Sequence, residues 1–164
     1  MTTTVDPRTL PIAFAPGVLR ARRETTRGVV HTLDTGRDWV EDIRAVDAWH
    51  KARGWRGIGY HAVIWRDGSI TQGRPADMIG AHTEGWNATS LAVALSGGKG
   101  ADRDDDFADH YTPAQATALE GYIRSALLIW PGMIWCGHHD HPAVSKACPG
   151  FNVAAWCRAR GITP

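Results

Sequence analysis

The sequence lacks the features that mark a membrane protein or a disulfide-stabilised protein. It holds no run of about 18 apolar residues, so we expect no transmembrane helix and no membrane insertion. Its three cysteines, an odd number, cannot all pair within the chain, which favours synthesis in a reducing compartment. The apolar stretch 10–16 contains two prolines, and its basic cluster follows instead of preceding it, so we expect no secretory signal.

An excess of charge of either sign is also missing. Eighteen Lys and Arg face 17 Asp and Glu, for a net charge of +1, which gives no electrostatic reason to expect nucleic acid as a partner. The 164 residues favour a single domain, and 43% hydrophobic residues suffice for a core without disulfides. We expect a monomer.

Hydrophobic periodicity predicts strands interleaved with helices. The expected strands are 28–31, 60–66, 69–72, 90–95 and 133–136, and the expected helices are 39–53, 113–130 and 153–160. Asp67-Gly68 predicts a hairpin, which excludes an all-parallel sheet. We therefore predict an α/β fold, a single domain with a central mixed sheet flanked by helices, over residues 28–164, preceded by an N-terminal extension of residues 1–27.

Two of the helices carry signals at their ends. In the first, Asp38 is the expected N-cap and Gly54 is expected to follow the last helical residue. The apolar stripe of this helix consists of Val40, Ile43, Val46 and Trp49, and Asp47 lies outside it on the polar side. In the second, Thr112 is the expected cap, Pro113 takes the first helical position and Gln115 completes a capping box.

A cluster of histidines and a cysteine is the strongest chemical signal. The chain has eight histidines, and the segment 137–149 brings together His138, His139, His141 and Cys148. Imidazole and thiolate are preferred zinc ligands, and His31, at the end of an earlier strand, is a candidate third ligand. Three protein ligands and a water form a catalytic zinc site. A surface loop with incidental histidines and a buried cysteine is the alternative.

Two further residues are candidates for catalysis. Tyr60 begins a predicted strand, and its phenol can donate to a developing oxyanion; the alternative is a core tyrosine with a hydrogen-bonded hydroxyl. Lys146 precedes Cys148 by two positions and can stabilise negative charge, or it is simply a solvated lysine.

The Gly-punctuated loop 80–87 is a candidate substrate contact through His82, Trp86 and Asn87, and an ordinary turn is the alternative. We expect His50 and His110 to be structural or exposed, and Cys136 and Cys157 to be buried thiols. The acidic run 102–109 fails as an EF-hand, since Phe107 stands where glycine is needed and Pro113 where glutamate is needed.

Five ordered segments together resemble a known family. They are Val29–Thr32; Trp49–Lys51 through Gly54-Trp55 to Gly59-Tyr60-His61; Arg66–Gly68; Gly80–His82 with Gly85 and Asn87; and Gly137–Asp140 leading to Lys146–Pro149. Over about residues 28–156 the chain resembles the type 2 N-acetylmuramoyl-L-alanine amidases, the family of phage lysozyme-type amidases and peptidoglycan recognition proteins. The likeness is greatest to the short phage endolysins.

The resemblance implies a zinc site of His31, His138 and Cys148, with Tyr60 and Lys146 as catalytic residues. It further implies cleavage of the amide between the lactyl group of N-acetylmuramic acid and L-alanine in peptidoglycan, with substrate contacts from His82, Trp86, Asn87 and His61. For a phage endolysin it implies cytoplasmic synthesis without a signal peptide and action on the cell wall after release.

Some alternatives stay open. His138 and Cys148 are farther apart than the family's ligands, which an insertion around His141 and Pro142 explains. The ligand is then either His138, which we prefer because it follows Gly137, or His139. A cytosolic amidase of murein recycling, a peptidoglycan-binding module without catalysis, and a hydrolase with Cys148 as nucleophile are the rival functions.

Overall fold

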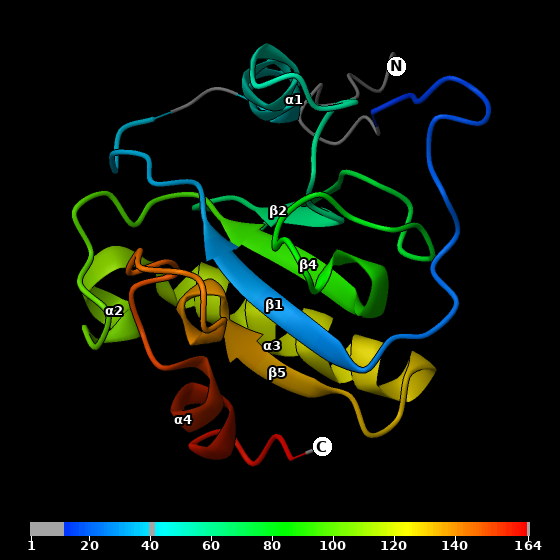
Figure 1. Cartoon of the computed structure of the whole chain (residues 1–164). Coiled ribbons are helices and arrows are strands. Elements are labelled where there is room, and N and C mark those ends of the chain that lie inside the picture. Colours follow the sequence, from blue (N-terminus) through cyan, green and yellow to red (C-terminus); the bar gives the residue numbers. More distant parts are fainter. Residues whose placement is uncertain (1–11, 40–41, 164) are drawn as a thin grey trace, which may run out of the picture.

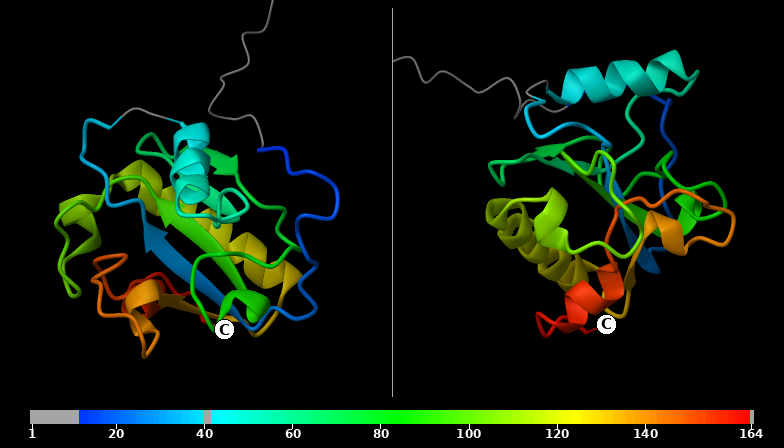
Figure 2. Two further views of the ribbon diagram at one scale, coloured as in Figure 1. Left: turned by 45° about the horizontal axis from the view of Figure 1, so that its top comes forward. Right: turned by 90° about the vertical axis from the view of Figure 1, so that its left-hand side faces the viewer.

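The computed structural model describes residues 12–39 and 42–163 and places them in three layers. A mixed sheet of five strands in the order β3-β2-β4-β1-β5 forms the middle layer (Figure 1). Helix α1 covers one face, and α3 and α4 cover the other (Figure 2). The strands are β1 (Arg27–Thr32), β2 (Ala62–Ile64), β3 (Ile70–Gln72), β4 (Ser90–Leu95) and β5 (Ile134–Gly137). The helices are α1 (Ile43–Ala52), α2 (Phe107–His110), α3 (Pro113–Ile129) and α4 (Val153–Arg158), with 3₁₀ turns η2 (Asn87–Thr89) and η3 (His138–Asp140).

The pairing of the strands confirms the predicted mixed sheet. β2, β4, β1 and β5 run parallel, and β3 pairs antiparallel with β2 through the turn at Asp67-Gly68. The parallel strands therefore end at one edge, where His31 of β1 and Gly137 of β5 lie near the carboxyl ends. Ligand sites of open α/β sheets form at this edge.

The side chains of β4 alternate in size as well as in direction. Leu91, Val93 and Leu95 pack into the core cluster beneath α3 and α4. Successive strand residues point to opposite faces, so Ser90, Ala92 and Ala94 face α1. Ile43 and Val46 of α1 pack there with Ala94 in a second, smaller cluster. Small residues on this face leave room over the centre of the sheet.

Helix α1 differs from the expectation in two ways. It begins at Ile43, and the N-cap is Asp42 instead of Asp38, because the Asp42 carboxylate accepts from the Arg44 N–H at 2.8 Å. Val40 lies outside the described residues. Asp47 was expected on the polar side, yet it is buried because it accepts from the Ile58 N–H at 2.7 Å. Gly54 does follow the helix, with φ of +82°.

Helix α3 begins as predicted. The Thr112 side chain accepts from the Gln115 N–H, and the Gln115 side chain accepts from the Thr112 N–H. Leu119, Ile123 and Ala126 are buried. Of the described helices, none has the length and apolar character needed to cross a membrane.

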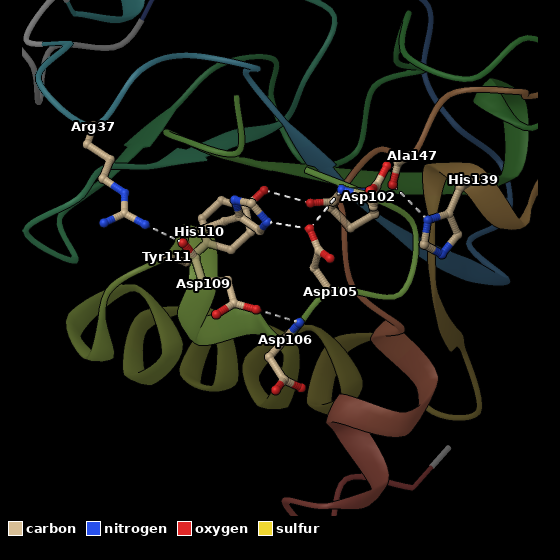
Figure 3. Close-up of polar contacts among 10 residues, drawn as sticks. Arg37, Asp102, Asp105, Asp106, Asp109, His110, Tyr111, His139 and Ala147 are labelled. Carbon is tan, nitrogen blue, oxygen red and sulfur yellow. Dashed lines mark hydrogen bonds and ion pairs between the residues drawn. The ribbon is translucent and has the colours of Figure 1, made fainter. Parts of the chain in front are cut away.

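The acidic run 102–109 leads into the short helix α2, which is not among the helices expected from the sequence. The carboxylates of this region bond to the loop itself (Figure 3). Asp105 accepts from the Asp102 N–H at 2.8 Å and contacts His110 Nε2 at 2.7 Å. Asp109 accepts from the Asp106 N–H at 3.1 Å. The acidic side chains thus fix the start of α2.

The segment before β1 packs against the rest of the domain. Ile12 and Phe14 contact the cluster beneath α1. The buried Arg22 guanidinium donates to the carbonyls of Ala76, Met78 and Ser90, at 2.5, 3.0 and 3.1 Å. Residues 12–26 are therefore joined to the fold by buried polar contacts as well as by apolar packing.

Candidate metal centre and cleft

Three predicted metal ligands come together at the carboxyl edge of the sheet. One ligand atom from each of His31, His138 and Cys148 lies within 4.8 Å of the other two, and this is the only such His/Cys/Asp/Glu group among the residues described. His31 is the second-last residue of β1, and His138 directly follows the neighbouring β5. Adjacent parallel strands thus place the two imidazoles side by side, with ring centroids 4.4 Å apart.

Backbone hydrogen bonds bring Cys148 to the two histidines. The His139 N–H donates to the Cys148 carbonyl at 2.7 Å, which closes the loop 139–148 at its base. The Thr32 N–H donates to Cys148 Sγ at 3.2 Å, and His31 Nδ1 lies 3.8 Å from the same sulfur. The ten residues between His138 and Cys148 therefore do not separate the two side chains.

His139 has a different environment from His138. It is buried, and its Nδ1 lies 2.9 Å from the Ala147 carbonyl (Figure 3). This bond makes Nδ1 the donor and holds the ring against the base of the loop. Of the two alternatives left open by the sequence, His138 is the residue that joins the cluster.

Burial sets the protonation of the cluster. It lowers the pKa of His31 well below the ordinary value, and the nearby His82 and His138 lower it further. The pKa of His138 falls to about 4, first through burial and then through Lys146. Burial raises the pKa of the Cys148 thiol to about 12, against the effect of the Thr32 N–H and Lys146. At neutral pH both imidazoles are uncharged and have a lone pair to offer.

A cleft of about 920 Å³ opens over the cluster. Tyr60, His82 and Lys146 line it together with the three candidate ligands, and α1 and the segment after it add Trp49, His50, Arg53 and Trp55. The Tyr60 ring centroid lies 5.0 Å from that of His31. Burial raises the pKa of the Tyr60 phenol, which keeps its proton at neutral pH. Lys146 is exposed at the rim.

Close backbone packing puts Tyr60 and His82 beside His31. A Cβ on Gly59 would lie 1.9 Å from the Ala81 carbonyl oxygen, so only glycine fits where these two segments touch. The Ala81 N–H donates to the Gly59 carbonyl at 3.1 Å. The residues that follow, Tyr60 and His82, then both reach the cluster.

Two of the residues predicted to contact the substrate, His61 and Asn87, have side-chain atoms that are hydrogen-bonded to the backbone of the fold. His61 is buried, its Nδ1 accepts from the Ala92 N–H at 2.9 Å, and its Nε2 lies 2.8 Å from the Met78 carbonyl. The Asn87 side-chain oxygen accepts from the N–H groups of His82 and Thr83, at 2.8 and 2.9 Å. The polar atoms of both residues are thus already bonded within the fold, and the substrate contacts expected for them stay predictions.

The third, Trp86, is not among the residues that line the cleft. Its ring lies 4.1 Å from the Arg27 guanidinium and 4.5 Å from the His141 ring. His50, expected to be structural or exposed, is buried and accepts from the Gly59 N–H at 2.8 Å, although its side chain also lines the cleft. Cys157 is buried as expected and Cys136 half-buried.

The eight tryptophans suggested that some would line a substrate groove, but the sequence did not identify Trp49 and Trp55 as those residues. Trp49 and Trp55 are 38% and 37% exposed there, although Trp49 was assigned to the core stripe of its helix. Eight tryptophans in the chain and the Trp-His pair at 49–50 were the available signals.

Comparisons with known proteins agree with this geometry. A family model described as N-acetylmuramoyl-L-alanine amidase matches residues 22–151. The endolysin of Enterobacteria phage K11 is 36% identical over 84% of this chain and 88% of its own length.

Solved structures show the same fold. N-acetylmuramoyl-L-alanine amidase LysC from Clostridium intestinale superposes with a TM-score of 0.75 and 25% identity, over 94% of this chain and 97% of that one. Drosophila PGRP-LB superposes with a TM-score of 0.71 and 21% identity, over 89% and 87% of the two chains.

Proposed function

The chain belongs to the N-acetylmuramoyl-L-alanine amidase family, and on that premise we propose that it is a zinc-dependent endolysin. Its reaction is hydrolysis of the amide between the lactyl group of N-acetylmuramic acid and the L-alanine of the stem peptide. The observation that carries the proposal is the meeting of His31, His138 and Cys148 beneath a cleft that Tyr60 and Lys146 also line.

The donor atoms of the cluster suit zinc. Two imidazole nitrogens and one sulfur are ligands that zinc prefers, and three protein ligands leave a fourth position for water or substrate. A thiol whose pKa is raised to about 12 is a poor nucleophile by itself, so a ligand role for Cys148 is favoured over a Cys–His hydrolase. When bound, a zinc ion acidifies a water molecule and polarises a carbonyl group.

Tyr60 and Lys146 stabilise the negative charge that develops on the carbonyl oxygen of the scissile amide. The Tyr60 phenol, half-buried in the wall of the cleft, keeps its proton and donates it in a hydrogen bond. The Lys146 ammonium supplies a positive charge from the rim of the cleft. One donor of this kind is typically worth about 10²–10³ in rate.

The wall of the cleft suits a glycopeptide. The exposed indoles of Trp49 and Trp55 offer apolar faces to sugar rings, and Arg53 offers a cation to carboxylates of the stem peptide. Cluster and cleft come from one chain, which is consistent with a monomeric enzyme built on residues 28–164. We also propose that the protein acts on the cell wall after release from the cytoplasm in which it is made.

Digestion of purified peptidoglycan tests the proposal. Mass spectrometry should find stem peptides with a free L-alanine amino group together with glycan that retains its lactyl group. A chelator should stop the reaction and added zinc should restore it. Cys148→Ser should abolish both zinc binding and hydrolysis, whereas Cys136→Ser, a thiol outside the cleft, should keep both. Full hydrolysis by a zinc-free Cys148→Ser protein would end the proposal.

A further inference from the structure

A line of buried hydrogen-bonding groups leads from the start of β4 to the candidate metal centre. Ser90 Oγ lies 3.2 Å from His82 Nε2, and His82 Nδ1 lies 3.1 Å from His31 Nε2. All three side chains are buried, with Ser90 fully so. Ser90 lies on the same face of β4 as the small residues Ala92 and Ala94.

The hydroxyl proton of Ser90 fixes the direction of this line. Ser90 Oγ donates to the Trp86 carbonyl at 2.7 Å. A hydroxyl has a single proton, so toward His82 the Ser90 oxygen can only accept. The His82 proton must then sit on Nε2, which leaves Nδ1 of the neutral ring as an acceptor.

His31 completes the line. Because His82 Nδ1 is an acceptor, the His31 nitrogen that faces it, Nε2, must carry the proton and donate. The other His31 nitrogen, Nδ1, is then bare, and it is the one that faces Cys148 Sγ. Thr83 Oγ1, at 3.1 Å from His82 Nδ1 and 3.5 Å from His31 Nε2, fits the same assignment because it can donate to the first and accept from the second.

We propose that Ser90 and His82 are positioning residues that hold His31 with its proton on Nε2 and its Nδ1 lone pair directed at the metal position. Partners of this kind orient a ligating imidazole, and their loss typically weakens metal binding about 10–100-fold. This role replaces the substrate contact that the sequence suggested for His82. The inference rests on the proposed function, since it assigns the roles of residues around its zinc site.

Nuclear magnetic resonance of the zinc-free wild-type protein tests the tautomers directly. Long-range ¹H–¹⁵N correlation spectra distinguish an imidazole protonated at Nε2 from one protonated at Nδ1. We expect the Nε2 form for His31 and for His82. A zinc-free protein in which His31 is protonated at Nδ1 would overturn the inference, and this measurement needs no variant to fold.

A second experiment measures zinc affinity by competition with a chromophoric chelator. Ser90→Ala removes the hydroxyl that accepts from His82 Nε2, although not the Ser90 backbone group that also bonds to His82, and should weaken zinc binding about 10-fold. Ser96→Ala is the matched control, because Ser96 is a similarly buried serine that directly follows the other end of β4, six residues from Ser90. Affinity of Ser90→Ala within twofold of both wild type and control would overturn the inference.

The outcomes separate this inference from the proposed function. Wild-type protein that binds no zinc contradicts the proposed function itself. If the wild type binds zinc and hydrolyses the amide but Ser90→Ala has an unchanged zinc affinity, the proposed function stands. Only the positioning role is then rejected.

Discussion

Two histidine-bearing loops flank His31, and they differ in how many of their side chains line the cleft. The loop 138–148 closes on itself through backbone and His139 contacts, and presents His138, Lys146 and Cys148 to the cleft. The loop 80–87 turns its Asn87 side chain inward onto its own backbone and presents only His82 to the cleft.

The difference shows what frees a side chain for chemistry. In loop 138–148 the side chains of Asp140 and His141 accept from the N–H groups of Gly137 and Ala143, at 2.7 and 3.1 Å, whereas His138, Lys146 and Cys148 line the cleft. In loop 80–87 the N–H groups of Trp86 and Asn87 donate to the Thr83 carbonyl at 3.0 Å, and the Asn87 side chain accepts from the N–H groups of His82 and Thr83. Buried polar groups need hydrogen-bond partners, so a side chain that pairs with a backbone N–H group cannot use the same atom to bind the substrate.

The largest effect is expected from the adjacent histidines of loop 138–148. His138→Ala should lose zinc and hydrolysis while remaining folded, because His138 belongs to the cluster. His139→Ala should keep zinc but lower the free energy of unfolding by about 0.5–1.5 kcal/mol, because the hydrogen bond from His139 Nδ1 to the Ala147 carbonyl is lost while the Gly150 N–H still donates to that carbonyl. Metal analysis and chemical denaturation of both variants measure the contrast. The opposite pattern would mean that His139 is the ligand.

The next largest effect is expected on turnover, and it distinguishes the metal ligands from the catalytic residues beside them. Tyr60→Phe and Lys146→Ala should retain zinc and lower kcat by about 10²–10³, because each removes one donor to the developing oxyanion. Metal content and turnover on purified peptidoglycan are measured on the same preparations. Loss of zinc from either variant would show that the residue holds the cluster together and would contradict a catalytic role.

Local signals predicted much of the fold. Strand β4 spans Ser90–Leu95 as expected, because alternation within six residues suffices to define it. The start of α3 followed from the capping box of Thr112 and Gln115, whose partners are three residues apart. The N-cap of α1 was placed at Asp38 instead of Asp42, since both positions offer an aspartate and only the three-dimensional path of the chain decides between them.

The candidate site, like the fold, was only partly predictable from local sequence. The cluster followed from residue types and from the resemblance, whereas the roles of neighbouring residues depend on partners far apart in sequence. His61 is bonded to Ala92, and His82 meets His31 across 51 positions. No local pattern reports such pairs. One available signal was the alternation of small and large residues in β4, which marks a face with room for imidazole rings.

A moderate effect on stability and zinc affinity is expected from Asn87, whose side chain bonds to the backbone of loop 80–87. Asn87→Ala leaves two N–H groups without their acceptor and should lower the free energy of unfolding by about 1–3 kcal/mol. Zinc affinity should fall as well, since the backbone of His82 is no longer held. Asn152→Ala, which removes the N-cap of α4, is the control: it should cost about 1 kcal/mol and leave zinc affinity unchanged. Equal zinc affinities in the two variants would contradict the link between Asn87 and His82.

The smallest effect is expected from the aromatic contact that joins the two loops. Trp86 packs against His141 and beneath Arg27, away from the residues that line the cleft. Trp86→Ala should therefore lower the free energy of unfolding by about 1 kcal/mol, the scale of an aromatic or cation–π pair. Its kcat/KM on purified peptidoglycan should stay within twofold of wild type, whereas Trp55→Ala, in the cleft wall, should raise KM. A tenfold rise in KM for Trp86→Ala would instead show that the substrate contact expected for Trp86 from the sequence is correct, and that loop 80–87 takes part in substrate binding.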